Sequence, residues 1–582
     1  MTWGKRRALI IGVMVLLIIG LIWAASKPAR LARGSVLVLD AEGEINEQRP
    51  VEFFDFLGEG PAPALHDYVD AIDAARTDAR ISGIVLRIAP LQTGWAKLEE
   101  IRAHLMAFRK SGKPSLCYLG YDGIGNPEYY LASACQQIWL VPTTPVNIRG
   151  LMAEALFLRG TLDKLKIVPE YYHIAEYKTA GNTYTEKKFT PAHREEVDSL
   201  LRSVYNQYLT DAAAARGMER EKFEALVKRG PIVATEAVQA GIVDRLGYWD
   251  QVQEYFRGRV GDWNPIPLAR YRIFLNNFMG EKIAVVTATG LIVSGASSKS
   301  PGGGGTMGGD SVAADLRRAR TDSGIKAIVL RIDSGGGSVV GSEVIRREVE
   351  LATGAKPVVV SMSDVAASGG YWIAAPANKI VADPNTITGS IGVVIGKWNI
   401  SGLFGLLGLS TDSVATSDNA SLFSAQQNFT PAQRAYIEKS IQQMYDEFKK
   451  GVAKGRNMPV EAVDKIGKGR VWSGAQAKEI GLVDELGGLD RAIEVAKRLA
   501  HIPASAQVRI VRLPEEKTFF EQLLERGRDQ LSEGGAEDFP ALARSAVDPG
   551  RLDARPLEAT LRRIVESMEP VQALVPFELR IH

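Results

Sequence analysis

Residues 81–88 read ISGIVLRI, and residues 325–332 read IKAIVLRI. Each octapeptide is rich in β-branched residues and has the length of a buried strand, and each follows shortly after Arg-Thr-Asp, at residues 76–78 and 320–322. Short apolar runs that alternate with helical patterns are typical of α/β proteins with mostly parallel strands. The two octapeptides therefore predict the same α/β unit at two places in the chain.

Matching segments extend this similarity along the chain. VLVLDAEGEI at 36–45 resembles IAVVTATGLI at 283–292, and AGIVDRLG at 240–247 resembles EIGLVDELG at 479–487. The members of each pair lie about 240 residues apart, and a constant period of this kind indicates a duplication. We therefore predict two tandem domains of one fold.

The second of these domains shows its elements most clearly. IVLRI at 328–332 and VVVSM at 358–362 are candidates for buried strands, and SEVIRREVELA at 342–352 has the apolar spacing of a helix. PGGGGTMGG at 301–309 lacks the GK[ST] sequence that would follow in a phosphate-binding P-loop. We expect that segment to be a flexible surface connection.

The repeat divides the 582 residues into four segments. Residues 31–280 and 281–510 form the two domains, which we call the first and the second repeat. Residues 1–30 precede them. Residues 511–582 have no counterpart in the first repeat, and we expect them to form a mainly helical tail.

An apolar segment lies near the beginning of the chain. Residues 8–25 read ALIIGVMVLLIIGLIWAA and carry no charge. About 20 apolar residues suffice to cross a bilayer, and a cleaved signal peptide usually has a shorter apolar region, of about 7–15 residues. Three basic residues flank the segment on each side, so the positive-inside rule leaves its orientation open. We predict a retained transmembrane anchor that contacts membrane lipid, with a cleaved signal peptide as the alternative.

The composition excludes several classes of function. Lys and Arg total 70 and Asp and Glu total 68, and a net charge of only +2 argues against nucleic acid as a partner. Two cysteines and six histidines are too few for a cysteine-rich metal site, so we expect neither a metal nor a cofactor. We expect Cys117 and Cys135 to be buried thiols rather than a disulfide.

The two repeats differ where a nucleophile is expected. In the second repeat Ser368-Gly369-Gly370 follows a predicted strand and begins a predicted helix. A serine at such a turn is held out for attack, and the next N–H groups point toward an oxyanion formed there. The first repeat has Asn126-Pro127-Glu128 at this place, so the hydroxyl is absent and the proline removes an N–H donor.

A glycine-rich segment shows the same asymmetry. Gly335-Gly336-Gly337 follows a predicted strand of the second repeat and suits a close approach of the backbone to a ligand. The first repeat has Leu91-Gln92-Thr93 there. The first repeat therefore lacks both the nucleophile and its glycine-rich wall.

A candidate base is present only in the first repeat. The first repeat carries Lys178 in HIAEYKTAGN, where the second repeat has Asp418. A single Ser/Lys site shared by the two repeats would explain why one repeat lacks the serine and the other lacks the lysine. A serine needs a base to take its proton, and burial can lower the lysine pKa by up to about 3–5 units, enough to make it one. Residues 281–500 contain no histidine, but a Ser-His pair using another histidine stays possible: His66, His104, His173, His193, His501 or His582.

Three segments resemble the long, duplicated form of the signal peptide peptidase family, also called protease IV. The most specific is SMSDVAASGGYWIAAPANKIVADPNTITGSIGVV at 361–394, supported by RIDSGGGSVVGSEVIR at 331–346 and EYKTAGN at 176–182. The similarity extends over residues 35–510. It implies an α/β fold with two tandem Clp protease/crotonase-like domains and an N-terminal transmembrane helix.

The resemblance also implies the roles of the site residues. Ser368 matches the nucleophile, Lys178 the general base, and Ser390 a serine that hydrogen-bonds the lysine amine, where the first repeat has Ile148. Gly369 matches one oxyanion donor, and Gly336 is expected to be the second. The family usually has Ser-Pro-Gly-Gly where this chain reads SGGG, so the wall around Gly336 lacks the proline.

The resemblance further implies a membrane-anchored serine endopeptidase that degrades cleaved signal peptides, with apolar peptides as its partners. Family members are bound to the bacterial inner membrane, face the periplasm and form homotetramers. The alternatives are a related membrane-bound peptidase that cuts membrane proteins, a crotonase-like acyl-CoA enzyme, and a non-catalytic membrane scaffold.

Overall fold

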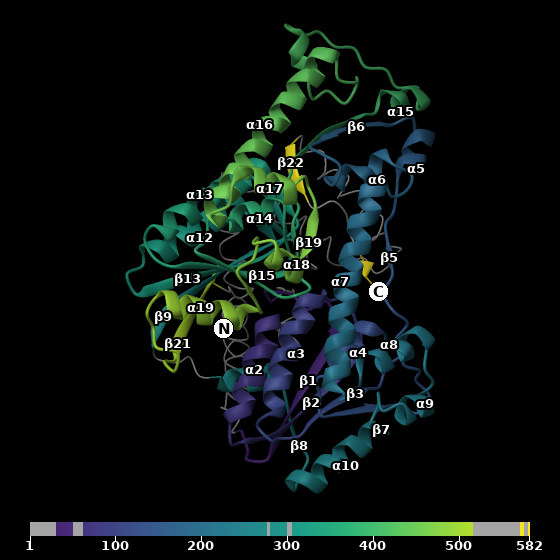
Figure 1. Cartoon of the computed structure of the whole chain (residues 1–582), viewed down its shortest axis with the longest axis vertical. Coiled ribbons are helices and arrows are strands. Elements are labelled where there is room, and N and C mark those ends of the chain that lie inside the picture. Colours follow the sequence, from purple (N-terminus) through teal and green to yellow (C-terminus); the bar gives the residue numbers. More distant parts are fainter. Residues whose placement is uncertain are drawn as a thin grey trace, which may run out of the picture.

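The computed structural model describes residues 31–49, 62–275, 280–299, 305–515, 571–574 and 580–581. Within these ranges the chain forms two α/β units that lie end to end (Figure 1), with the main sheet of the first repeat below and that of the second above. A third, mixed sheet joins them at one side. The active-site candidates lie where these units meet.

The first repeat is built on a parallel sheet of six strands in the order β7-β4-β3-β2-β1-β8. Neighbouring residues of β1 point to opposite faces: Leu37 packs against the helices α2, α3 and α7, and Val36 packs against α10. Both faces are therefore covered, as is usual for a parallel sheet. The bounds are β1 Ser35–Gly43, β2 Ile81–Leu91, β3 Ser115–Leu119, β4 Gln137–Leu140, β7 Arg245–Leu246, β8 Asn264–Pro267, α2 Leu65–Thr77, α3 Trp95–Arg109, α7 Pro191–Ala215 and α10 Trp249–Val260.

The second repeat repeats this architecture in the order β19-β17-β15-β13-β9-β21, with β16 beside β15 and β20 beside β16. All of these pairs are parallel except β17 with β19. One face packs against α12, α13, α14 and α16, and the other against α19. The bounds are β9 Glu281–Thr289, β13 Ile325–Ser334, β15 Val358–Ala367, β16 Lys379–Ala382, β17 Ile387–Gly389, β19 Val471–Ser473, β20 Glu485–Leu486, β21 Val508–Leu513, α12 Gly309–Thr321, α13 Val339–Thr353, α14 Gly369–Ala374, α16 Pro431–Arg456 and α19 Leu489–Leu499.

The predicted α/β class and the tandem duplication are confirmed. The predicted strands 328–332 and 358–362 lie inside β13 and β15, and the predicted helix 342–352 lies inside α13. The central strands read as continuous apolar runs because both faces of each sheet are covered.

One expectation about local structure is wrong where the structure describes it. Residues 305–308 of the glycine-rich segment form strand β12 (Gly305–Gly308), because they pair with β10 (Leu291–Val293). Most of the predicted helical tail after residue 510 lies outside the described residues. Within its described part, β21 continues to Leu513, and short strands lie at Val571–Leu574 (β22) and Arg580–Ile581 (β23). The tail as a whole therefore stays a prediction.

The two cysteines form a disulfide, contrary to the expectation of free thiols. Cys117 lies in β3 and Cys135 follows helix α4 (Asn126–Ala132), and the fold brings their Cα atoms to 5.8 Å. Both residues are fully buried in the core of the first repeat, as expected. A separation of 18 residues does not reveal this proximity, which depends on how α4 packs against the sheet.

The predicted membrane anchor at residues 8–25 lies outside the described residues. Among the residues that are described, no helix combines the length and the apolar character needed to span a bilayer.

The mixed sheet that joins the repeats has the order β11-β12-β10-β14-β22-β18-β6, where β11 is Ser298–Lys299. Strand β6 (Val168–His173) belongs to the first repeat, but it pairs antiparallel with β18 (Val394–Asn399) of the second. On its other side β18 adjoins β22, which lies next to the glycine-rich strand β14 (Gly336–Ser338). A strand of the first repeat is thus part of the sheet that borders the candidate nucleophile.

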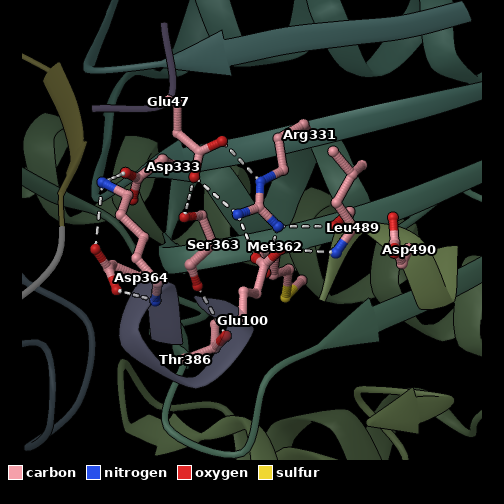
Figure 2. Close-up of polar contacts among 12 residues, drawn as sticks. Glu47, Glu100, Arg331, Asp333, Met362, Ser363, Asp364, Thr386, Leu489 and Asp490 are labelled. Carbon is pink, nitrogen blue, oxygen red and sulfur yellow. Dashed lines mark hydrogen bonds and ion pairs between the residues drawn. The ribbon is translucent and has the colours of Figure 1, made fainter. Parts of the chain in front are cut away.

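A buried polar cluster forms a second contact between the repeats (Figure 2). Arg331 of β13 points at the carboxylates of Glu47 and Glu100 from the first repeat, with an Nε–Oε2 distance of 2.9 Å to Glu47. Lys97 of α3 reaches the ends of two strands of the second repeat, 2.8 Å from Asp333 and 3.3 Å from Asp364. Because Asp333 precedes the glycine-rich segment and Asp364 lies four residues before Ser368, this cluster supports both walls of the site.

Candidate active site

Ser368 lies at the sharp turn between strand β15 and helix α14. Its backbone has φ 55° and ψ −114°, a conformation that non-glycine residues rarely adopt. Two hydrogen bonds hold the turn: the Ser368 N–H donates to the carbonyl of Gly389 (2.8 Å), and the Trp372 N–H donates to the carbonyl of Ser368 (2.8 Å). A strained backbone kept in place by its surroundings is typical of functional positions.

Glycine is required directly after this serine. A Cβ atom at Gly369 would lie 2.6 Å from the Oγ of Ser342 and 3.1 Å from the Cα of Gly336. The backbone of the predicted oxyanion donor Gly369 therefore packs against the glycine-rich strand β14. The structure thus brings Ser368, Gly369 and Gly336 to one place.

The second predicted oxyanion donor, the N–H of Gly336, is less well placed to bind an oxyanion. Its φ is 102°, which glycine adopts without strain. Its N–H donates to the Oγ of Ser334 at 3.2 Å, so this N–H already has a partner within the loop. The role of Gly336 therefore stays a prediction.

Lys178 reaches the second repeat because the strand before it is part of the joint sheet. β6 pairs with β18 over six residues, and the Ile174 N–H donates to the carbonyl of Val393 (3.3 Å) where the chain leaves the sheet. The chain then turns into a short 3-10 helix at Thr179–Gly181, which begins directly after Lys178. The lysine side chain is completely buried.

The three predicted polar residues meet in one group. The Nζ of Lys178 lies 2.6 Å from the Oγ of Ser368 and 3.0 Å from the Oγ of Ser390, and it also donates to the carbonyl of Ser390 (3.2 Å). All three residues are completely buried. Ser390 also has a left-handed backbone, with φ 50°. The geometry fits a nucleophile, an adjacent base and a hydroxyl that orients the base.

Burial changes the charge state of the lysine. Removal from water lowers the pKa of Lys178 well below its usual range, because the protonated form loses its solvation, and the nearby carboxyl group of Glu196 partly opposes this effect. An uncharged amine can accept a proton from a serine hydroxyl, whereas an ammonium cannot. The site therefore has the electrostatics of a Ser/Lys general-base pair.

The corresponding place in the first repeat is filled by a side chain. Asn126 lies where the second repeat has Ser368, and Glu128 of the same helix accepts the N–H groups of Leu91 (2.7 Å) and Gly125 (2.8 Å). The backbone donors around this turn are thus occupied by a carboxylate. In the second repeat Asp418, the counterpart of Lys178, is exposed at the beginning of a short 3-10 helix, Asp418–Ser421.

Three histidines among the described residues have other surroundings. His193 of α7 packs edge-on against Phe189, with ring centroids 4.7 Å apart, and the Nδ1 of His173 lies 2.8 Å from the carbonyl of Ala175. His104 lies between two carboxylates, with Nδ1 3.0 Å from Asp73 and Nε2 3.5 Å from Asp490. The partner that Ser368 has in this structure is Lys178.

A potential metal-ligating group does occur among the described residues. Ligand atoms of Asp73, His104 and Asp490 lie within 4.8 Å of one another. Each ring nitrogen faces a different carboxylate, an arrangement that suits a protonated imidazole between two anions. In agreement with this, and despite the burial of the ring, the adjacent carboxylates raise the pKa of His104.

Two residues of the site gave no recognisable signal in the sequence. Gly469 precedes β19 with φ 84°, and a Cβ atom there would lie 2.4 Å from the backbone nitrogen of Lys178. Glu196 of α7 accepts a hydrogen bond from the hydroxyl of Thr179 (2.9 Å), next to the lysine. Both contacts join residues of different elements, so no local pattern predicted them.

Replacing Gly469 with Ala should displace Lys178 without removing any reacting group. The added methyl group would overlap the lysine backbone, and a shift of about 1 Å in a catalytic group can lower the rate by about 100-fold. We expect a reduced kcat with little change in KM, measured on a peptide substrate. Gly451→Ala is the control, because a Cβ atom there meets no atom within 4 Å. Equal activity of the two variants would contradict the tight packing of Lys178.

Comparison with known proteins gives a consistent result. The sequence pattern of peptidase family S49 matches twice, at residues 107–260 and 350–503. "Serine protease SPPA, chloroplastic" from Arabidopsis thaliana is 34% identical over 85% of this chain and 73% of its own length. "Protease 4" from Salmonella typhi is 36% identical over 75% of this chain and 72% of its own length. "Putative signal peptide peptidase SppA" from Enterococcus faecium is 35% identical over 31% of this chain and 54% of its own length.

Solved structures resemble the chain only distantly. A ClpP1 mutant from Listeria monocytogenes is 17% identical, with a TM-score of 0.23, over 36% of this chain and 94% of its own length. A score of this size does not establish a shared fold, so the Clp protease/crotonase-like assignment stays a prediction. The two matches to one family, in contrast, coincide with the duplication seen in the sequence and in the fold.

Proposed function

The chain belongs to peptidase family S49 and is a serine peptidase, and on this basis we propose that Ser368 is its nucleophile and Lys178 its general base. This proposal rests on the 2.6 Å contact between the lysine Nζ and the serine Oγ, which are both completely buried. Each group comes from a different repeat, so neither repeat alone would hold a complete site.

Acylation follows from this geometry. Neutral Lys178 takes the proton of Ser368 while the serine Oγ attacks the carbonyl carbon of the peptide bond. The carbonyl oxygen gains a negative charge, which the N–H of Gly369 at the beginning of α14 stabilises. As the tetrahedral intermediate collapses, the lysine ammonium returns its proton to the leaving amine, and the acyl group stays on Ser368.

Deacylation uses the same groups with water as the nucleophile. Lys178, neutral again, takes a proton from water, whose oxygen attacks the acyl carbon and forms the second tetrahedral intermediate. The proton then returns to the Oγ of Ser368 as the ester bond breaks. Ser390 orients the amine throughout, because its hydroxyl and carbonyl lie 3.0 and 3.2 Å from the lysine Nζ.

We propose apolar peptides, in particular cleaved signal peptides, as the substrates. The name of the Enterococcus faecium relative supports this class. The strand arrangement supports an extended binding mode, because β22 pairs antiparallel with the glycine-rich strand β14, with Leu574 opposite Gly336. A peptide bound by strand addition at this edge would make the same backbone hydrogen bonds in place of β22.

We also propose an anchored, oligomeric protein in the bacterial inner membrane with its domains in the periplasm. The apolar segment 8–25 supports the anchor, and the Cys117–Cys135 disulfide fits an oxidising compartment such as the periplasm. Both repeats expose large apolar side chains: Met152, Leu156, Leu406, Leu407 and Val414. Such surfaces often mark protein contacts. They support a homo-oligomer, which we propose to be the tetramer of the family.

The decisive experiment compares the products formed from one synthetic signal peptide by mass spectrometry. Ser368→Ala should produce no fragments, because no other group on the described chain is placed to attack as this serine is. Asn126→Ala, at the matching turn of the first repeat, is the control and should keep the wild-type products. Unchanged cleavage by Ser368→Ala would refute the proposed nucleophile.

The nearer alternative, a peptidase that cuts membrane proteins, uses the same site and differs only in substrate. Offering an intact membrane protein and a free signal peptide in one assay separates the two. The acyl-CoA alternative and the non-catalytic scaffold are not supported, because the chain is a serine peptidase.

A further inference from the structure

Helix α7 of the first repeat docks along strand β19 of the second. In Figure 1 this long helix extends from the lower unit to a position beside β19. Val197 and Leu200 of the helix pack against Val471 of the strand. Hydrogen bonds flank this apolar contact, between Ser203 and Ser473 (2.7 Å) and between Ser199 and Gln476 (3.1 Å). The helix position relative to β19 is therefore fixed on several sides.

Glu196 lies at the centre of this contact and is completely buried. One carboxyl oxygen accepts the hydroxyl of Thr179 at 2.9 Å, and the other accepts the backbone N–H of Val471 at 3.3 Å. Thr179 is the residue after Lys178. A single side chain therefore joins the lysine segment of the first repeat to a strand of the second.

Strand β19, which Glu196 contacts, pairs with strand β17 directly before Ser390. In the pairing of β19 with β17, Val471 lies opposite Gly389, the residue before Ser390. The Ser390 N–H donates to the carbonyl of Arg470 at 2.7 Å. Glu196 thus contacts Thr179, which follows Lys178, and Val471, which lies opposite the residue before Ser390.

We propose that Glu196 is a positioning residue, which fixes Lys178 against Ser390 and Ser368. This inference rests on the proposed Ser/Lys function. The matching position of the second repeat is Tyr436, which is exposed, so the arrangement belongs to the first repeat alone.

The charge state of the carboxyl group adds to this positioning. Burial raises the pKa of Glu196 to about 8, although hydrogen bonds from Thr179 and Val471 and the positive charges of Arg470 and Lys178 oppose the rise. At neutral pH Glu196 therefore accepts both hydrogen bonds without placing a full negative charge beside the lysine amine.

The titratable groups nearest Glu196 have other partners or are neutral. Arg470 pairs with the exposed Glu195, at 2.8 Å. His193, one turn earlier on α7, has its pKa lowered to about 4 by burial, so it is neutral at pH 7.

The test measures kcat and KM for cleavage of a synthetic signal peptide. Glu196→Ala removes both hydrogen bonds and should lower kcat by about 10- to 100-fold with KM nearly unchanged. Glu196→Gln keeps an oxygen acceptor of the same length and should restore kcat to within about threefold of wild type. Glu195→Gln is the control and should keep the wild-type kcat and KM.

Two results would overturn the inference: wild-type kcat in Glu196→Ala, or a loss of kcat in Glu196→Gln as large as that in Glu196→Ala. If Glu196→Ala does not fold, Glu196→Asp, whose shorter side chain cannot reach both Thr179 and Val471, takes its place with the same readout. Failure of the proposed function would look different, because Ser368→Ala would then cleave the peptide as wild type does.

Discussion

Replacing Lys178 with Ala should lower kcat for peptide cleavage by about 10³-fold while the chain stays folded. The amine lies 2.6 Å from the Oγ of Ser368, and without it the serine loses the base that the structure places beside it. The loss should not be recovered at any pH. In wild type, kcat/KM should rise with pH through the pKa of Lys178, because only the neutral amine accepts a proton, and burial places that pKa well below 10.5.

Folding of this variant follows from the same burial. A buried amine costs solvation energy, so its removal leaves a cavity but no unpaired charge. Circular dichroism and the unfolding temperature check the fold. Lys187→Ala serves as the matched control, because Lys187 is a surface residue that pairs with Asp163. A Lys178→Ala variant with more than a tenth of the wild-type activity would show that another group is the base.

Replacing Arg331 with Met should lower the free energy of unfolding by about 3–5 kcal/mol, because removal of one partner leaves buried carboxylates uncompensated. The guanidinium is 1% exposed and contacts Glu47 and Glu100 of the first repeat, as Figure 2 shows. Burial raises the pKa of Glu47, but Arg331 outweighs this effect and holds it at about 2. Without the arginine, Glu47 would have to take up a proton or separate from the second repeat.

The first repeat supplies a control at the matching strand position. Arg87 is 34% exposed and pairs with Asp40, which is 50% exposed, so Arg87→Met should cost at most about 1 kcal/mol. Guanidinium unfolding, followed by circular dichroism, measures both variants. Equal stability losses would show that the buried cluster does not hold the repeats together.

The strands and the duplication were predictable because their signal is local. ISGIVLRI and IKAIVLRI are mainly apolar, since each strand they form is covered on both faces. The turn at Ser368 was predictable because Ser-Gly-Gly follows a predicted strand and the first repeat lacks a serine at the matching place. The comparison of the two repeats then indicated Lys178, which lies 190 residues away.

What sequence could not predict depends on contacts between distant elements. β6 leaves its own repeat to pair with β18, and only this pairing delivers Lys178 to the serine. Glu196 and Gly469 matter because α7 and the segment before β19 meet there. The Cys117–Cys135 disulfide likewise depends on the packing of α4 on β3, so a count of two cysteines gave the wrong expectation.

The central claim is that one site is assembled from both repeats, and a double variant tests it most directly. Initial rates of signal peptide cleavage would be measured by mass spectrometry for wild type, Lys178→Ala, Ser368→Ala and the combined variant. Groups that act as one unit are not additive. We expect both single variants and the double variant to fall to the same residual rate. Multiplicative losses, or a Lys178→Ala variant that cleaves well while Ser368→Ala does not, would contradict a shared Ser/Lys site.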